Sequence, residues 1–204
     1  MKQYFIGLGL ASGATNDSGI AVIDRQNEII LIDKLFTMQD VQYFFENFSS
    51  LKNSHICISL PPDNSLLNGK WRIFSKLYQQ LNLKVNFQNL NNWTQRYSNR
   101  GSDYFLNLVE NEISVNRFEI YLTRQALNLN SCFKDRSPAD CKSFQNALRM
   151  KYGFTTLPAN MMPMAQLEAL MGAVLAKKIT EDFEQTQKMP KPLFEFNGIS
   201  VIRG

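Results

Sequence analysis

The stretch YFIGLGLASGATNDSGIAVID, residues 4–24, decides the fold of this chain. Its apolar first part, residues 4–10, predicts a buried strand, and residues 19–24 predict a second strand after a turn of small and polar residues. A tight turn at residues 25–27 leads to a third predicted strand at residues 27–36. The chain is therefore expected to open as an antiparallel three-strand meander.

The next segments predict a change to helix and parallel strand. Residues 39–48 carry Val41, Phe44 and Phe45 at helical spacing. Residues 55–60 are short and apolar, and Pro61, which has no N–H, ends this predicted strand. After a meander and a helix, such a segment is expected to be a buried parallel strand. A helix at residues 71–81, a strand at 84–87 and irregular structure at 91–101 are predicted to follow.

The second half of the chain predicts helices and a final hairpin. Residues 117–122 predict a strand that runs into a helix at 123–129. Ser137 resembles an N-cap before Pro138 and predicts a helix through about residue 151. Residues 163–179 form the strongest helix prediction, because their apolar positions share one broad face. The pair Asn197-Gly198 favours a tight hairpin turn.

Together these elements predict an α/β fold of the ribonuclease H-like type. This fold has a mixed sheet, an antiparallel three-strand meander followed by parallel strands, with helices on both faces. The chain has 204 residues, which suits one domain over residues 1–204 and allows a helical insertion at about residues 123–160.

Composition narrows the function classes. The apolar runs are too short to span a bilayer, so no membrane association is predicted and a cytoplasmic location is the default expectation. Three cysteines without paired spacing and a single histidine, His55, give little support for a zinc site or a Cys–His catalytic pair. The net charge of +4, with both signs mixed, permits contact with nucleic acid without requiring it.

Four short motifs, in order along the chain, resemble the ribonuclease H-like proteins grouped as the domain of unknown function 429 family. The segment FIGLGL resembles their first strand, with Gly9 in place of an aspartate, and ICISLPP resembles their second motif, with Ser59 in place of an acid. The segment FEIYLTRQAL retains the glutamate and tyrosine of a third motif as Glu119 and Tyr121. In MAQLEALMGAVLAKKI, which resembles the last helix, Glu168 stands in place of an aspartate.

The resemblance implies hydrolysis of phosphodiesters by one or two Mg²⁺ or Mn²⁺ ions held by converging carboxylates. Gly9 removes the ligand that normally touches both ions. The predicted catalytic residues are Glu119, Glu168 and Asp63, and Asp17 is a further predicted metal ligand. Each has a simpler interpretation: Asp17 and Asp63 suit a turn and a loop, and the two glutamates could face solvent.

Basic side chains near these motifs are candidates for phosphate contact. The predicted nucleic-acid-binding residues are Lys70, Arg72 and Arg124, and Arg136 is one of several further arginines that could extend a phosphate track. Scattered arginines are more often solvated surface residues. The glycine-rich segment GLGLASG does not have the spacing of a P-loop or of a dinucleotide-binding turn.

Three functions remain open from the sequence. The leading prediction is a ribonuclease H-like protein that has lost catalysis and retains binding of nucleic acid or another ligand. The first alternative is an active Mg²⁺- or Mn²⁺-dependent nuclease with relocated carboxylates. The second alternative is a protein-interaction domain, which predicts an exposed apolar patch and no acidic cluster.

Overall fold

The computed structural model describes residues 2–10, 18–59, 104–192, 194–196 and 199–202. The strands, in chain order, are β1 (Tyr4–Gly9), β2 (Ser18–Asp24), β3 (Ile29–Leu35), β4 (Ser54–Ser59), β5 (Ser114–Phe118), β6 (Phe194–Phe196) and β7 (Ile199–Ile202). The helices are α1 (Met38–Asn47), the short 3₁₀ helix η1 (Leu51–Asn53), an unlabelled helix at residues 104–110, α4 (Ile120–Ala126), α5 (Pro138–Tyr152) and α6 (Met164–Thr186).

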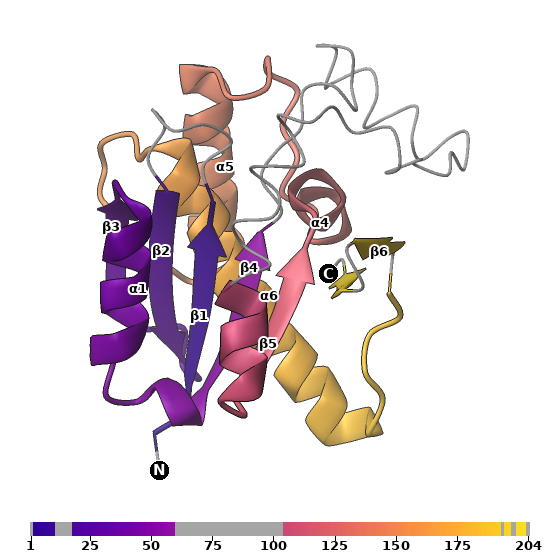
Figure 1. The fold of residues 1–204 in the computed structure, drawn as a ribbon. Helices are drawn as coiled ribbons and strands as arrows, with labels where there is room; N and C mark the ends of the chain where they lie inside the picture. The colour runs from indigo at the N-terminus through magenta and orange to yellow at the C-terminus, as the bar shows by residue number, and fades with distance from the viewer. Residues whose placement is uncertain (1, 11–17, 60–103, 193, 197–198, 203–204) are drawn as a thin grey trace.

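The strands form one mixed sheet in the order β3-β2-β1-β4-β5-β7-β6 (Figure 1). β1 pairs with β2 and β2 with β3 in antiparallel fashion, which confirms the predicted meander. β4 lies parallel to β1, β5 parallel to β4, and β7 parallel to β5. β6 and β7 form the predicted antiparallel hairpin, although residues 197–198 lie outside the described residues.

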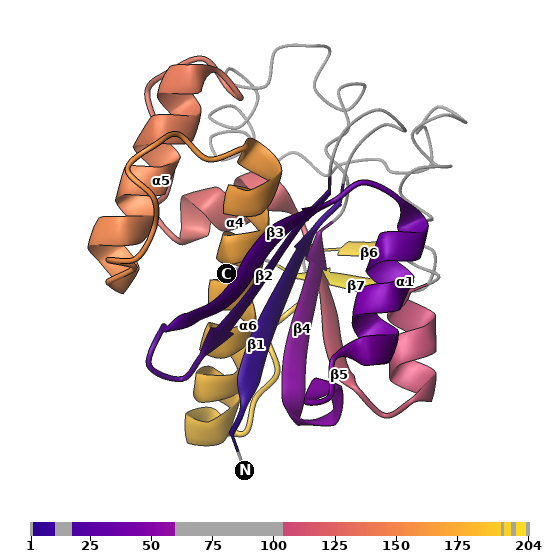
Figure 2. The same ribbon diagram turned by 90° about the vertical axis from the view of Figure 1, so that its left-hand side faces the viewer.

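Helices cover both faces of the sheet, as predicted (Figure 2). One face packs against α1 and the helix at residues 104–110, through a core that includes Ile6, Leu8 and Val41. The other face packs against α6, with α4 and α5 in the same apolar core. The chain is therefore an α/β protein with a mixed sheet between two helical layers. Within the part of the chain that the structure describes, no helix combines the length and hydrophobicity of a membrane span.

The α6 helix lies on the sheet at very short range because glycines line its path. A β-carbon added to Gly7 would lie 1.8 Å from the carbonyl oxygen of Ala169, and one added to Gly19 would lie 2.0 Å from that of Ala165. Alternation along β1 directs Gly7 and Gly9 toward α6, while Ile6 points to the opposite face. Small residues on both surfaces thus allow backbone-to-backbone contact.

Capping residues set the helix ends. Ser137 caps α5 by accepting from the Asp140 N–H, and Gly153 ends the helix in the left-handed region at φ 72°, so this helix was predicted correctly. α6 extends to Thr186, beyond the predicted end at residue 179. The charged pairs Lys177–Glu181 and Lys178–Asp182, each at i,i+4 spacing, support the added turns.

Two predicted boundaries differ from the structure. The strand expected at residues 117–122 ends at Phe118, and α4 begins at Ile120, because the Glu119 carboxylate caps that helix. The helix at residues 104–110 was not predicted. The helix expected at 71–81, the strand at 84–87 and the irregular segment at 91–101 lie outside the described residues.

Candidate functional site

The candidate site lies where the parallel strands β1, β4 and β5 end. Gly9 and Ser59 are the last residues of β1 and β4, and Glu119 directly follows β5. The carboxyl ends of parallel strands share one edge of a sheet, and α6 passes this edge with Glu168 in its second turn. The four positions chosen by resemblance are thus brought to one place.

Glu119 is a partly buried helix cap that retains a proton more readily than an ordinary glutamate. Its Oε2 accepts from the Leu122 N–H at 2.7 Å, and its own N–H donates to the carbonyl oxygen of Ile202 at 3.3 Å. Burial raises the pKa of Glu119 to about 7, and the nearby Glu168 carboxylate adds to the rise, although the backbone N–H groups of Leu122 and Tyr121 oppose it. Burial therefore favours the protonated form of this side chain.

Glu168 is almost fully buried and is paired with an arginine. Its Oε1 accepts from Nη1 of Arg136 at 2.7 Å, and the residue is 2% exposed. Burial raises the pKa of Glu168, while the cations Arg136 and Arg124 act in the opposite direction. The same carboxylate is the main cause of the raised pKa of Arg136. A permanent positive charge therefore stands directly against the carboxylate that was expected to bind metal.

Gly9 does not leave an empty ligand position. A β-carbon at this residue would lie 2.7 Å from the carbonyl oxygen of Ala165, 3.1 Å from the Ala169 nitrogen and 3.3 Å from the β-carbon of Glu168. The backbone of α6 occupies the volume that an aspartate on β1 would need. The missing acid is thus coupled to the close packing of α6 on the sheet.

Ser59 and Arg117 join the strand ends by hydrogen bonds. The Ser59 Oγ accepts from the N–H of Leu10 at 2.8 Å. Arg117 is 1% exposed, and it donates to the carbonyl oxygens of Ile58 at 3.3 Å and Ser59 at 3.0 Å. Burial lowers the pKa of Arg117 to about 9. The sequence did not predict a role for Arg117, because β5 (SVNRF) also contains serine and asparagine and an arginine does not stand out in it.

Arg124 belongs to a buried network. Its guanidinium bonds both carboxylate oxygens of Asp140, at 2.9 and 3.2 Å, and lies 4.3 Å from the centre of the Phe144 ring. Asp135 lies 3.6 Å from the same guanidinium and accepts from the Tyr121 hydroxyl at 3.1 Å. Because Arg124 is 4% exposed and already bonded, its position does not support the predicted contact with nucleic acid.

The described residues do not fit a two-metal centre. Of the predicted ligands, Glu119 and Glu168 come together, and Asp17 and Asp63 lie outside the described residues, as do Lys70 and Arg72. Within the described ranges, no group of three or more His, Cys, Asp or Glu side chains could hold a metal ion. Arg136, which was considered only as a phosphate contact, instead supplies the cation beside Glu168.

Comparison with known proteins assigns no family. No family model matches the sequence, and no curated protein matches it at a significant level. The resemblance described above therefore stays a prediction.

Proposed function

We propose that this chain is a ribonuclease H-like domain that has lost metal-dependent hydrolysis of phosphodiesters and retains the binding of nucleic acid. The strand order β3-β2-β1-β4-β5, with an antiparallel meander followed by parallel strands, supports the fold. The position of α6 across β1 and β2, with Glu168 near the strand ends, is what that fold would require of its last helix.

The ion pair between Arg136 and Glu168 is the observation that carries the loss of catalysis. A guanidinium stays protonated at all physiological pH values, and its planar donors suit a carboxylate. In a hydrolytic site the same carboxylate would face a divalent cation. Here the protein provides its own cation 2.7 Å away, so a metal ion would have to displace Arg136 against direct electrostatic attraction.

The residues at the ends of β1 and β4 also support the loss of catalysis. In the proposed ancestral site, a carboxylate on the first strand bridges both metal ions. Gly9 has no side chain, and α6 fills the space beside it. Ser59 offers a neutral hydroxyl that already accepts from a backbone N–H. Two of the expected ligands are thus replaced by contacts that hold the strands and the helix together.

Binding is the activity that such a site would retain. The chain has a net charge of +4, and a positive protein attracts polyanions through release of their counterions. Lys70 and Arg72 remain the proposed phosphate contacts. The affinity is then expected to fall steeply as salt rises and to show little dependence on sequence.

One observation favours the alternative of an active nuclease. The partly buried Glu119 and the buried Glu168 lie at the same edge and interact electrostatically, as two carboxylates that share a metal ion would. An active site would need Asp17 or Asp63 as a third carboxylate and a displaced Arg136. The two proposals therefore differ in whether divalent ions support cleavage.

The test combines binding and cleavage on the same substrates. Fluorescence anisotropy with labelled single- and double-stranded DNA and RNA, in EDTA, should show binding that weakens as salt rises. The substitutions Lys70→Gln and Arg72→Gln should each reduce the salt dependence, and Lys188→Gln, on an exposed residue after α6, serves as the matched control. Absence of binding to all four substrates would overturn the binding role and favour a protein-interaction domain.

Cleavage of the same substrates with added Mg²⁺ or Mn²⁺ tests the catalytic part. We expect intact substrate over hours, with no difference between the native protein and Glu168→Gln. Metal-dependent cleavage that Glu168→Gln abolishes would establish the active-nuclease alternative.

A further inference from the structure

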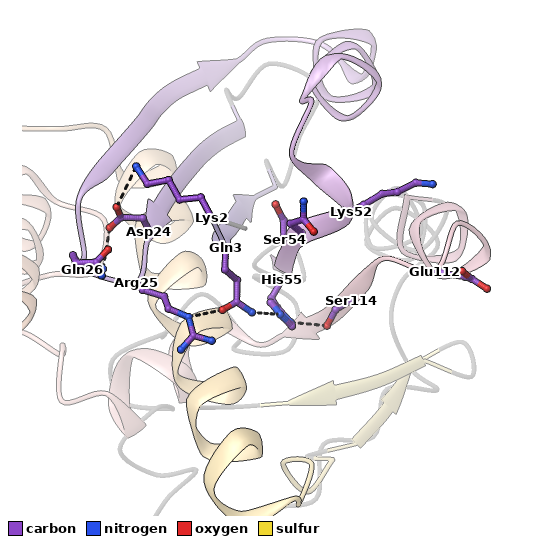
Figure 3. Close-up of a pocket in the computed structure, with 11 residues that line it drawn as sticks. Lys2, Gln3, Asp24, Arg25, Gln26, Lys52, Ser54, His55, Glu112 and Ser114 are labelled. Atoms are coloured by element: carbon purple, nitrogen blue, oxygen red, sulfur yellow. Dashed lines mark hydrogen bonds and ion pairs between the residues drawn. The ribbon is translucent and has the colours of Figure 1, made fainter.

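A second polar site lies at the opposite end of the parallel strands. A pocket of about 590 Å³ opens where β4 and β5 begin, and its lining includes Lys2, Gln3, Arg25, Lys52 and His55 (Figure 3). This volume is in the range of pockets that hold small molecules. The candidate site described above lies at the ends of the same strands, so the two sites are separate.

A chain of hydrogen bonds forms one wall of this pocket (Figure 3). Both terminal nitrogens of Arg25 bond the Glu184 carboxylate of α6, and its Nε donates to the Oε1 of Gln3 at 2.6 Å. The Nε2 of Gln3 lies 2.7 Å from the Nε2 of His55, and the Nδ1 of His55 lies 3.0 Å from the Oγ of Ser114. Five separate segments of the chain are thus linked in series.

The donors in this series of hydrogen bonds determine which ring nitrogen of His55 carries the proton. The Arg25 Nε can only donate, so the Gln3 oxygen faces Arg25 and the Gln3 amide nitrogen faces His55. Because that amide nitrogen is also only a donor, the Nε2 of His55 must accept, and the ring proton is on Nδ1. The network thus favours neutral His55, and burial, the main cause, lowers the pKa of His55 as well.

Protonation of His55 breaks this arrangement at one contact. A proton on Nε2 would face the amide N–H of Gln3, and the amide cannot turn around without placing its NH₂ group against Arg25. The imidazolium then carries an N–H that lacks an acceptor. An anion entering the pocket can provide that acceptor, so anion binding and proton uptake should favour each other.

The other charged groups around the pocket favour an anion. Lys2 forms an ion pair with Asp24 at 3.9 Å, a distance beyond that of a hydrogen bond, and the Lys52 side chain forms no ion pair within the described part of the chain. The Oδ1 of Asp24 is occupied by the backbone N–H groups of Gln26 and Glu28, at 2.9 Å each.

The other carboxylates near the pocket are paired with Arg25 or lie at the rim. Glu184 forms an ion pair with Arg25, and Glu181 of α6 also attracts Arg25 electrostatically. Glu112 is exposed at the far rim, beyond Ser114 (Figure 3). Lys52 thus has an ammonium group without an ion pair among the described residues, and the Lys2 ammonium is shared with Asp24; the two flexible side chains lie on either side of His55 (Figure 3).

We infer that this pocket binds a small oxyanion, the phosphate group of a phosphomonoester, together with a proton taken up by His55. The volume accommodates a group of mononucleotide size, and the two lysines would bind phosphate as point charges. The site is independent of the proposed loss of catalysis at the other edge.

NMR of the intact protein tests this inference directly, because His55 is the only histidine and its ring signals are unambiguous. The pKa of His55 is measured without ligand and with millimolar sulfate, whose charge is constant over the titration. It is then measured with inorganic phosphate, a nucleoside 5′-monophosphate and the parent nucleoside. We expect each anion to raise the pKa of His55 by about one unit, and hence to bind about tenfold more weakly above neutrality. The nucleoside should leave the pKa unchanged.

Substitutions identify the pocket as the source of the effect. Lys2→Gln and Lys52→Gln should each weaken sulfate binding severalfold, while Lys188→Gln should match the native protein. An unchanged pKa of His55 at millimolar anion would overturn the inference. An equal rise in the Lys2→Gln/Lys52→Gln double variant would also overturn it, because it would show general ionic screening rather than a site. A response to the nucleoside equal to that of its monophosphate would refute phosphate recognition.

Discussion

Nη1 of Arg136 lies 2.7 Å from Oε1 of Glu168, across 32 positions of sequence, at the edge where three parallel strands end. The glutamate is buried, while the arginine side chain is 37% exposed at the boundary with solvent. Arg136 also has a left-handed backbone, with φ at 56°, and its N–H donates to Asp140 at 2.9 Å. The loop before α5 is thus bent so that a guanidinium reaches into the site.

Removal of the guanidinium should destabilise the protein. In Arg136→Met the Glu168 carboxylate loses its partner inside the protein. Breaking a fully buried pair costs about 3–5 kcal/mol. Because Arg136 is partly exposed and solvent screens it, we expect a smaller loss of about 1–3 kcal/mol in the free energy of unfolding at pH 7. Urea unfolding at constant slope measures the change.

A second substitution separates the ion pair from general packing. Glu168→Gln in the Arg136→Met background removes the unpaired charge and should recover most of the lost stability. If the double variant is as unstable as the sum of the two single variants, the two side chains are not coupled and the assignment of Arg136 as the internal cation is wrong.

Alanine substitution at a glycine beneath α6 should destabilise the protein more, the closer the added β-carbon lies to the helix backbone. Gly7→Ala would place a β-carbon 1.8 Å from a carbonyl oxygen and should cost about 3 kcal/mol or more. Gly9→Ala meets the corresponding oxygen at 2.7 Å and should cost about 1–3 kcal/mol. Gly153→Ala contacts nothing within 4 Å and should cost only the strain of its positive φ, about 1–2 kcal/mol. Thermal unfolding of the three variants measures the order.

The same packing predicts the outcome of an attempted repair. Gly9→Asp restores the acid that the resemblance expects, but it should lower stability at least as much as Gly9→Ala and should not confer Mg²⁺-dependent cleavage. A folded Gly9→Asp variant that cleaves nucleic acid would show that α6 can move aside and that only the carboxylate is missing.

Local patterns were sufficient to predict the α/β class and much of the secondary structure of the described residues. The alternating and apolar runs of β1 to β4 and the cap at Ser137 act within a few residues, so the meander, the parallel strand and α5 could be predicted from the sequence. The boundary at Glu119 was misplaced because a glutamate can equally continue a strand or cap a helix. The bond to the Leu122 N–H decides between these.

The character of the site depended on distant contacts that no local pattern contains. The partner of Glu168 is Arg136, which lies in the loop before α5, 32 residues earlier in the chain. In the sequence nothing distinguished Arg136 from the other arginines. Likewise, Gly9 could be recognised as the place of a missing acid, but the reason for the glycine lies in the backbone of α6, more than 150 residues later.

The pair Arg124–Asp140 should contribute to stability and not to nucleic-acid binding. Both side chains are at most 5% exposed, and two hydrogen bonds join them. Asp140→Ala leaves the guanidinium buried without its main partner and should cost about 3–5 kcal/mol. Arg124→Lys should also destabilise, because an ammonium cannot make both bonds. For variants that remain folded, anisotropy with labelled RNA and DNA should give native affinity; a selective loss of affinity in Arg124→Lys would restore the phosphate-contact role.

Glu119 should make the free energy of unfolding fall as pH rises toward neutrality. Its pKa is about 7 in the folded protein, compared with an ordinary value of 4.5. Between these two values the folded protein binds more protons than the unfolded chain, so stability must fall as pH rises and level off above about 7. The neighbouring Glu168, whose pKa is also raised, acts in the same direction.

The substitution Glu119→Gln should remove the part of this dependence that belongs to Glu119. Glutamine keeps an oxygen that can accept from the Leu122 N–H, so α4 retains its cap. We expect the native protein to lose up to about 3 kcal/mol relative to Glu119→Gln between pH 4.5 and 7. Urea unfolding of both proteins at several pH values gives the difference, in which titrations shared by the two proteins cancel. If the two stability curves are parallel, Glu119 is ionised in the folded protein over this pH range. Glu119, which unlike Glu168 is not paired with an arginine, would then be the first residue to test as a metal ligand.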